Sequence, residues 1–319
     1  MDKFNLPDVQ ATKTGFFNYP IGKVGVRNIK VPFTLSRKEN GSFFTTTATI
    51  SSYCNLVEDV KGINMSRISR TINDVLGNND ISGFCNLNDF VYALQRNHNT
   101  DNIFIKAAFD YIVEDKSPIS KETSYEPYQV VFESILKGDI LENYISVRSI
   151  EMSLCPCSKE MSLLKNNLNA SELEWIDSLP SKLKEKVLKA GFGAHNQKSD
   201  IEIKVLVKSG QTVWIEDLIN IIRLGSSTPA YSTLKRPDEK YATETSYMGG
   251  YFNEKLEFIP VEGTGPKFVE DISRDVANKL NNMLDRKILD YVVVVNNQES
   301  IHSGDITATA IISAGRKLT

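Results

Sequence analysis

The order of apolar and polar positions in the first half of the chain predicts two strands, then two helices, then three more strands. The strand segments are rich in Val, Ile, Thr and Phe with rough alternation, which is typical of half-buried strands. They cover residues 23–33, 43–53, 103–113, 129–133 and 144–154. The first helix is predicted from Met65, Ile68, Ile72 and Val75, which share one helical face, and a short second helix from residues 90–94.

With 144–154 taken as its first strand, the second half of the chain repeats the order of strands, helices and strands. Residues 201–207 alternate and then become continuously apolar, which predicts a strand. A short amphipathic helix is expected over 214–222, and apolar residues four apart predict a longer one from Phe268 to Leu284. Two strands, 291–295 and 306–312, close the chain. Because strands and helices are segregated rather than singly alternating, the predicted fold class is α+β.

One segment interrupts this second series of elements. Charged and apolar residues mix with helical spacing from 171 to 189, so the segment reads as a helical insertion. Ser171 is expected to cap the helix, and Glu174, three residues later, to complete a capping box.

Charge and composition exclude several classes of protein. The 319 residues carry 37 Lys and Arg against 40 Asp and Glu, a net charge of −3, so a basic nucleic-acid binder or a polybasic membrane-surface protein is not expected. The longest apolar run, 291–295, is too short to span a membrane, and residues 1–8 hold no secretory signal. We therefore expect a cytoplasmic protein without nucleic-acid or membrane partners.

The four cysteines are too few for a disulfide scaffold in a chain of this length. Cys155 and Cys157 follow a predicted strand, where a thiolate facing a cleft is a plausible ligand for zinc or iron. The alternative is a pair of small buried thiols, since free cysteine is among the most buried residue types. Cys54 and Cys85 are expected to be structural.

Two of the three histidines are candidates for chemistry. His195 lies on a glycine-flanked turn beside polar amides, a setting that favours a metal ligand or proton carrier over a core residue. His302 follows Glu299 by three residues at the end of a predicted strand, where a turn with a surface ion pair is the alternative. His98 is expected to be solvated.

Two charged segments remain. Residues 234–240 pack five charges around a proline, and the default interpretation of such a run is a solvated turn. Glu270 and Asp271 open the long helix, where a carboxylate favours the positive helix end or accepts hydrogen bonds from a guanine edge. The segment 191–193 lacks the third glycine and the Lys-Ser/Thr of a phosphate-binding loop.

Eight short motifs in order resemble those of the type IB GTP cyclohydrolases. They include Leu-Cys-Pro-Cys-Ser-Lys at 154–159, Gly-Ala-His-Asn-Gln at 193–197 and Glu-Ser-Ile-His at 299–302. The others lie at 6–10, 23–27, 62–67, 234–241 and 267–271. The resemblance implies a tunnelling fold, with two tandem modules of antiparallel sheet and helices on one face, assembled as a homotetramer with active sites between subunits.

The resemblance also implies a reaction. GTP would be hydrolysed to 7,8-dihydroneopterin triphosphate and formate, for folate or 7-deazaguanine synthesis. This chemistry requires a Lewis acid and groups that carry protons. Carried over by motif, Cys155, His195 and Glu239 would hold a divalent metal, Zn²⁺, Mn²⁺ or Fe²⁺. Glu299 and His302 would carry protons beside it.

Substrate contacts follow from the same motifs. Glu270 would anchor the guanine edge, while Arg67, Lys235 and Arg236 would hold the triphosphate, because guanidinium and ammonium groups suit phosphate oxygens. The predicted division is an N-terminal arm at 1–20, a first module at 21–140 and a second at 141–319. The second would carry a helical insertion near 161–189 and a smaller one near 247–265.

Two departures keep other functions open. Family members usually have histidine where Asn64 stands, and asparagine cannot carry a proton at neutral pH. The segment before His195 is longer than in bacterial members, and archaeal relatives that make a cyclic phosphate from GTP also carry extra sequence there. The alternatives are therefore an archaeal-type enzyme or a purine- or pterin-binding protein without catalysis. A nitrile reductase of the same fold would need a Glu-Ser-Lys-Ser pattern, which the sequence lacks.

Overall fold

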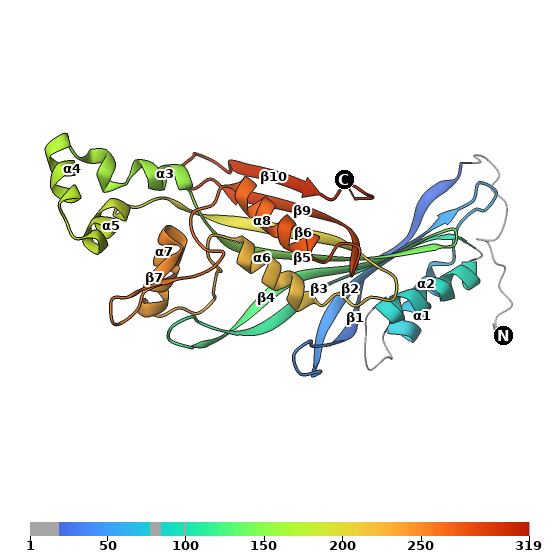
Figure 1. The fold of residues 1–319 in the computed structure, drawn as a ribbon. Helices are drawn as coiled ribbons and strands as arrows, with labels where there is room; N and C mark the ends of the chain where they lie inside the picture. Colours follow the sequence, from blue (N-terminus) through green and yellow to red (C-terminus); the bar gives the residue numbers. More distant parts are fainter. Residues whose placement is uncertain (1–18, 77–83, 99, 319) are drawn as a thin grey trace.

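The computed structural model describes residues 19–76, 84–98 and 100–318 (Figure 1). The predicted arm at 1–20 therefore lies almost entirely outside the described residues. Within the described ranges, no helix is both long and apolar enough to cross a membrane.

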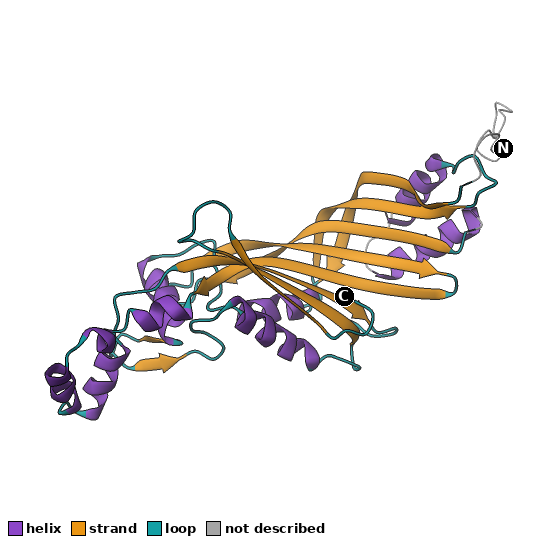
Figure 2. Cartoon of the chain, turned by 90° about the horizontal axis from the view of Figure 1, so that it is seen from above, coloured by secondary structure: helices purple, strands orange, loops and turns teal. Residues whose placement is uncertain are grey.

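Eight strands form one antiparallel sheet in the order β1-β2-β3-β4-β5-β6-β9-β10. Figure 2 shows the strands running side by side as one twisted sheet. The strands are β1 (Ile21–Ser36), β2 (Phe43–Leu56), β3 (Asn102–Lys116), β4 (Thr123–Lys137), β5 (Ile140–Leu154), β6 (Asn196–Val207), β9 (Ile288–Gln298) and β10 (Thr307–Ser313). A separate hairpin pairs β7 (Gly250–Phe252) with β8 (Phe258–Pro260).

Four helices cover one face of this sheet. Leu136 on β4 pairs with Leu141 on β5, and Val130 pairs with Val147, so the buried side chains of the two halves point to the same side. Onto this side pack α1 (Met65–Leu76), α2 (Phe84–His98), α6 (Ile215–Gly225) and α8 (Val269–Asn281). The predicted α+β class, with an antiparallel sheet and helices on one face, is confirmed, and it is the architecture expected of a tunnelling fold.

The two halves share one order of elements. We call β1–β4 with α1 and α2 the first module, and β5, β6, β9 and β10 with α6 and α8 the second module. In each module, two strands are followed by two helices and then by two more strands. Only Gly138 and Asp139 separate β4 from β5, and Gly138 has a φ of 59°, which a residue without a Cβ adopts at little cost.

Both modules are closely packed. In the first, the Phe33 ring lies 5.1 Å from that of Phe109 and 6.3 Å from that of Phe132, and Phe33 is fully buried. In the second, a Cβ at Gly225 would lie 2.4 Å from Val276 Cγ2, so α6 and α8 touch at a position where only glycine fits.

The connection from β5 to β6 holds the predicted helical segment. It contains α3 (Pro156–Met161), a short 3₁₀ helix (Leu164–Asn167), α4 (Ala170–Asp177) and α5 (Ser181–Lys189). Figure 1 shows α4 and α5 projecting at the end of the molecule opposite to α1 and α2. The predicted cap at Ser171 is wrong: Asn169 caps α4, and the Glu172 carboxylate accepts from the Asn169 N–H at 2.8 Å. Asparagine is as good a cap as serine, so composition alone did not separate the two sites.

The segment 234–240 is a helix start rather than a solvated turn. Helix α7 (Arg236–Met248) begins there, with Pro237 in its first turn. Asp238 is fully buried and accepts from the N–H groups of Ile119, Ser120 and Lys235 at 2.8–2.9 Å. Burial alone would raise the pKa of Asp238, but a hydrogen bond from the Ser120 hydroxyl together with these N–H groups outweighs it and lowers that pKa. The carboxylate thus ties α7 to the turn between β3 and β4.

Candidate functional site

The helix-facing positions of three neighbouring strands change from apolar to polar at the same level of the second module. Further along each strand the same face carries Val147, Ile203 and Val293, which are fully buried. We call the polar positions that continue this face the polar ladder. It consists of Glu151, Ser153 and Cys155 on and after β5, His195, Gln197 and Ser199 on and before β6, and Asn297 and Glu299 on and after β9.

Register places Cys155 opposite His195 at the outer end of the polar ladder. Leu154 pairs with Asn196, and the Cys155 N–H donates to the His195 carbonyl at 3.3 Å. Residues directly opposite one another in an antiparallel pair project to the same side, with Cβ atoms about 5 Å apart. The thiol and the imidazole, 40 positions apart in sequence, are thus neighbours because of strand pairing.

Both side chains are held by local contacts. Cys155 is the N-cap of α3, and its sulfur accepts from the Ser158 N–H at 3.5 Å. The Ser158 hydroxyl in turn accepts from the His195 N–H at 3.2 Å. Across the site, His195 Nδ1 lies 3.3 Å from Ser300 Oγ, which joins the histidine to the turn after β9.

That turn carries Glu299 and His302, as predicted. The His302 N–H donates to the Glu299 carbonyl at 3.2 Å, so these residues form a turn rather than a helix. Glu299 Oε1 accepts from Gln197 Nε2 at 3.4 Å, a contact that fixes the carboxylate relative to β6.

The start of α8 adjoins the same end of the sheet. The Lys267 N–H donates to the Leu154 carbonyl at 3.2 Å, and Ser153 Oγ donates to the Lys267 carbonyl at 3.2 Å. Lys267 Nζ is held by the carbonyls of Gly225 and Gly263 at 2.8 and 2.7 Å. Glu270, in the first turn of α8, is exposed, so its carboxylate is free to face a ligand.

A thiolate beside an imidazole whose Nδ1 is already engaged suits a soft divalent cation, which would bind Sγ and Nε2. Two of the three predicted ligands therefore fit. Across residues 19–76, 84–98 and 100–318, however, no three His, Cys, Asp or Glu side chains form a group that could hold a metal. Glu239 is exposed in the first turn of α7 and does not join the pair, so its role stays a prediction.

Two of the predicted triphosphate residues lie at the start of α7, and the third lies on α1. Lys235 forms an ion pair with Glu122, and Arg236 is exposed at the start of α7. Arg67 lies on α1, and Figure 1 shows α1 and α3 at opposite ends of the molecule. A single chain therefore does not bring Arg67 and Cys155 together.

Sequence reasoning missed the buried members of the polar ladder. Ser153, Ser199 and Asn297 are at most 1% exposed and were not candidates. A signal was present, since the alternation of the predicted strand at 201–207 continues backward and assigns Ser199 and Gln197 to its buried face. A polar residue at a buried strand position is the informative exception.

Three minor expectations are also corrected. Cys54 is buried in the first module as expected, but Cys85 is exposed. His98 is half-buried rather than solvated; burial, with a smaller contribution from Arg67, lowers its pKa. Cys155 and Cys157 are not a buried pair either, because Cys157 is exposed.

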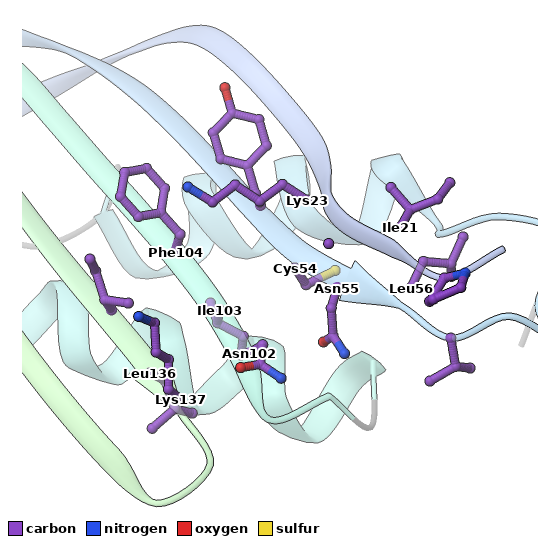
Figure 3. Close-up of a pocket in the computed structure, with 15 residues that line it drawn as sticks. Ile21, Lys23, Cys54, Asn55, Leu56, Asn102, Ile103, Phe104, Leu136 and Lys137 are labelled. Carbon is purple, nitrogen blue, oxygen red and sulfur yellow. The ribbon is translucent and has the colours of Figure 1, made fainter.

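A hollow of about 690 Å³ lies in the first module, away from the polar ladder (Figure 3). Lys23, Tyr53 and Phe104 contribute to its lining, with the Lys23 ammonium 4.7 Å from the centre of the Phe104 ring. None of the residues that line it is a predicted site residue. The chemistry expected from the sequence is therefore not located in this hollow.

Comparison with known proteins links the chain to one family. The sequence model of that family, described as type I GTP cyclohydrolase folE2, matches residues 6–308. A protein named GTP cyclohydrolase FolE2 from Magnetococcus marinus is 31% identical over 312 residues, covering 98% of this chain and 97% of its own length. Its namesake from Geobacter sp. is 32% identical, covering 95% and 93%. Among solved structures, uricase from Arthrobacter globiformis matches with a TM-score of 0.48 at 6% identity, covering 97% of both chains.

Proposed function

The chain belongs to the type I GTP cyclohydrolase FolE2 family, and from that premise we propose that it hydrolyses GTP to 7,8-dihydroneopterin triphosphate and formate. Within the family we assign it to type IB, on the motifs at 154–159, 193–197 and 299–302. The observation that supports the proposal best is the pairing of Cys155 with His195 at the polar end of an otherwise apolar sheet face.

We propose that Cys155 Sγ and His195 Nε2 hold a divalent cation, Zn²⁺, Mn²⁺ or Fe²⁺, and that Glu239 completes the set. Such a cation supplies the Lewis acidity that makes hydroxide available near neutral pH. Ser158 and Ser300 keep the two ligands in place, because one bonds the Cys155 sulfur and the other lies against His195 Nδ1.

Proton transfer is assigned to the turn after β9. Ring opening of the guanine imidazole and release of formate both require groups that give and take protons. The Glu299 carboxylate and the His302 imidazole lie on the turn that contacts His195 through Ser300. Glu299 Oε1 and the His302 ring nitrogens are the atoms proposed to hold these protons.

Substrate binding is assigned to three charged regions. Glu270 would accept hydrogen bonds from the N1–H and amino group of guanine, because a carboxylate offers two acceptors side by side. Arg67, Lys235 and Arg236 would bind the triphosphate. Because Arg67 and Cys155 lie far apart in one chain, we propose that a second copy supplies it, in a homotetramer with active sites between subunits.

The remaining parts of the proposal concern the organisation of the chain. We propose module boundaries at residues 20 and 140, with 161–189 and 247–265 as insertions relative to the family, and a cytoplasmic location. Helices α4 and α5 occupy most of the first insertion, and the β7–β8 hairpin lies within the second. The product would serve folate or 7-deazaguanine synthesis.

The deciding experiment is anaerobic incubation of metal-reconstituted protein with GTP, with formate quantified and the pterin identified by mass spectrometry. Formate with dihydroneopterin triphosphate supports the proposed reaction. A cyclic phosphate would assign the archaeal-type reaction instead. GTP binding without formate, with each of the three metals, would favour a non-catalytic purine- or pterin-binding protein with Asn64 as the altered residue.

A further inference from the structure

Three buried polar atoms of the polar ladder have no hydrogen-bond partner among the described residues. They are Gln197 Oε1, Ser199 Oγ and Asn297 Oδ1. Their residues are 9%, 0% and 1% exposed, so bulk water does not satisfy them. Buried polar atoms are almost always paired, and a group of such exceptions calls for a bound partner.

The three atoms belong to adjacent positions on one face of the sheet. Ser199 and Asn297 are directly paired between β6 and β9, which sets their Cβ atoms about 5 Å apart. Gln197 is two residues before Ser199 on the same face. A single small molecule on this face of the sheet can therefore reach all three atoms.

The other polar ends of the two amides are already engaged. Asn297 Nδ2 donates to Ser153 Oγ at 3.2 Å, and Gln197 Nε2 donates to Glu299 Oε1 at 3.4 Å. What remains is two carbonyl oxygens, which only accept, and one hydroxyl, which donates or accepts. The partner must donate at least two hydrogen bonds and be small enough for a site closed to solvent.

We propose that Gln197, Ser199 and Asn297 bind one buried water molecule, and that this water orients the Gln197 amide so that Nε2 faces Glu299. Water supplies two donors and two acceptors, and a buried water typically makes about three hydrogen bonds, the number offered here. With its Oε1 held by the water, the amide cannot rotate without losing that bond. Gln197 is thus a positioning residue that acts through Glu299.

The second half of the proposal rests on the proposed function, because it assumes that Glu299 carries protons for GTP hydrolysis. The first half does not. The water site is a property of the folded chain and is tested without substrate.

The water itself is tested by a high-resolution crystal structure of the metal-loaded full-length protein. A density peak within hydrogen-bond distance of Gln197 Oε1, Ser199 Oγ and Asn297 Oδ1 is the expected result. A map in which Ser199 Oγ donates directly to Asn297 Oδ1, with no water on this face of the sheet, would overturn the site.

The positioning role is tested with Gln197→Met, which keeps the length of the side chain and removes its hydrogen bonds. We expect kcat to fall about tenfold or more, as for the loss of a hydrogen bond to a charged group, while KM, metal content and melting temperature stay near the wild-type values. Gln298→Met is the matched control, since Gln298 is the adjacent residue on the exposed face of β9. Equal kcat values for the two variants would refute the role.

Ser199→Ala provides a second variant if Gln197→Met does not fold. It removes one of the three bonds to the water, so we expect a smaller fall in kcat, with KM unchanged. An unchanged kcat would count against the positioning role. Wild-type protein that releases no formate from GTP would instead disprove the proposed function, and the density peak would still decide the water site.

Discussion

The two modules repeat the same order of strands and helices but differ at corresponding ends. Where β1 leads into β2, the helix-facing side chains include Phe33, Leu35 and Phe109, which are at most 6% exposed. Where β5 leads toward β6, that face carries the polar ladder instead. The connection also differs: residues 37–42 join the first pair of strands, whereas residues 155–195, with helices α3–α5, join the second.

This difference indicates that the first module contributes mainly to stability, whereas the second carries the candidate site. In the first module, aromatic side chains pack on the helix-facing side of the sheet, and their burial stabilises the folded state. The second module gives up part of that packing to hold buried hydroxyl, amide and carboxyl groups. The same order of elements therefore serves as a scaffold in the first module and carries the candidate site in the second, and substitutions in the two modules should have different consequences.

Substitutions at the outer end of the polar ladder should have the largest effect on activity. We expect Cys155→Ala and His195→Ala each to abolish metal retention and formate release, because each removes one of the two proposed ligands that strand pairing brings together. Metal per chain is measured by elemental analysis after dialysis. Cys54→Ala is the matched control in the first module, where the thiol is buried among apolar residues and its loss should leave metal bound. Full metal content in Cys155→Ala would contradict the ligand assignment.

A substitution in the first module should have the opposite signature. Phe33→Ala removes a fully buried ring that contacts Phe109 and Phe132, and should lower the free energy of unfolding by about 3–5 kcal/mol. Urea denaturation measures the loss. Metal content and kcat of the protein that remains folded should match the wild type, and a reduced metal content in the folded fraction would show that the modules are not separable in this way.

A substitution at the start of α8 should separate substrate binding from metal binding within the second module. Glu270→Ala should leave the metal bound but weaken GTP binding about tenfold to a hundredfold, the effect of losing hydrogen bonds to a charged acceptor. Calorimetric titration with GTP measures the change. Glu262→Ala, an exposed carboxylate on the segment before α8, is the control. Unaltered GTP affinity in Glu270→Ala would remove this residue from the substrate site.

The smallest expected effect concerns Glu151, the innermost carboxyl group of the polar ladder. It is 2% exposed, and burial raises its pKa even though Ser149 Oγ and the Ala230 N–H donate to it at 2.6 and 2.8 Å. The folded state therefore binds the proton more tightly than the unfolded state. Stability from this group is present at low pH and is lost as pH rises above the ordinary value of 4.5, by up to about 1.4 kcal/mol per pH unit.

Glu151→Gln removes that dependence. Urea denaturation of wild type and variant at a series of pH values from 4 upward should give curves that diverge, with the wild type losing stability relative to the variant. Parallel curves would mean that Glu151 does not titrate differently in the two states.

Much of the fold follows from alternation along the chain, but the strand lengths do not. The strand predicted at 129–133 is part of β4, which runs from Thr123 to Lys137. Its flanks include Pro127 and several polar residues, whose side chains argue against a strand, while pairing with β3 holds their backbone in place. Tertiary pairing thus overrides local preference at the N-terminal end of β4.

Only part of the candidate site could be predicted from the sequence. Cys155 and His195 carry recognisable chemistry, and the antiparallel pairing of β5 and β6 explains why they meet. Glu239 was chosen by motif alone, and its place in the first turn of α7 could not be foreseen from a run of charges that favours a turn. Arg67 illustrates a further limit, because we propose that another copy supplies it, and a single sequence does not specify which residues come from another copy.

The two-residue turn between β4 and β5 has a consequence for motion. Backbone pairing between β4 and β5 runs from Gln129 opposite Arg148 to Lys137 opposite Ile140. The two modules are therefore joined by strand hydrogen bonds and not by a flexible linker. A hinge there would have to break those hydrogen bonds. We therefore expect amide protons of β4 and β5 to exchange only through global unfolding, so that the chain melts as one cooperative unit.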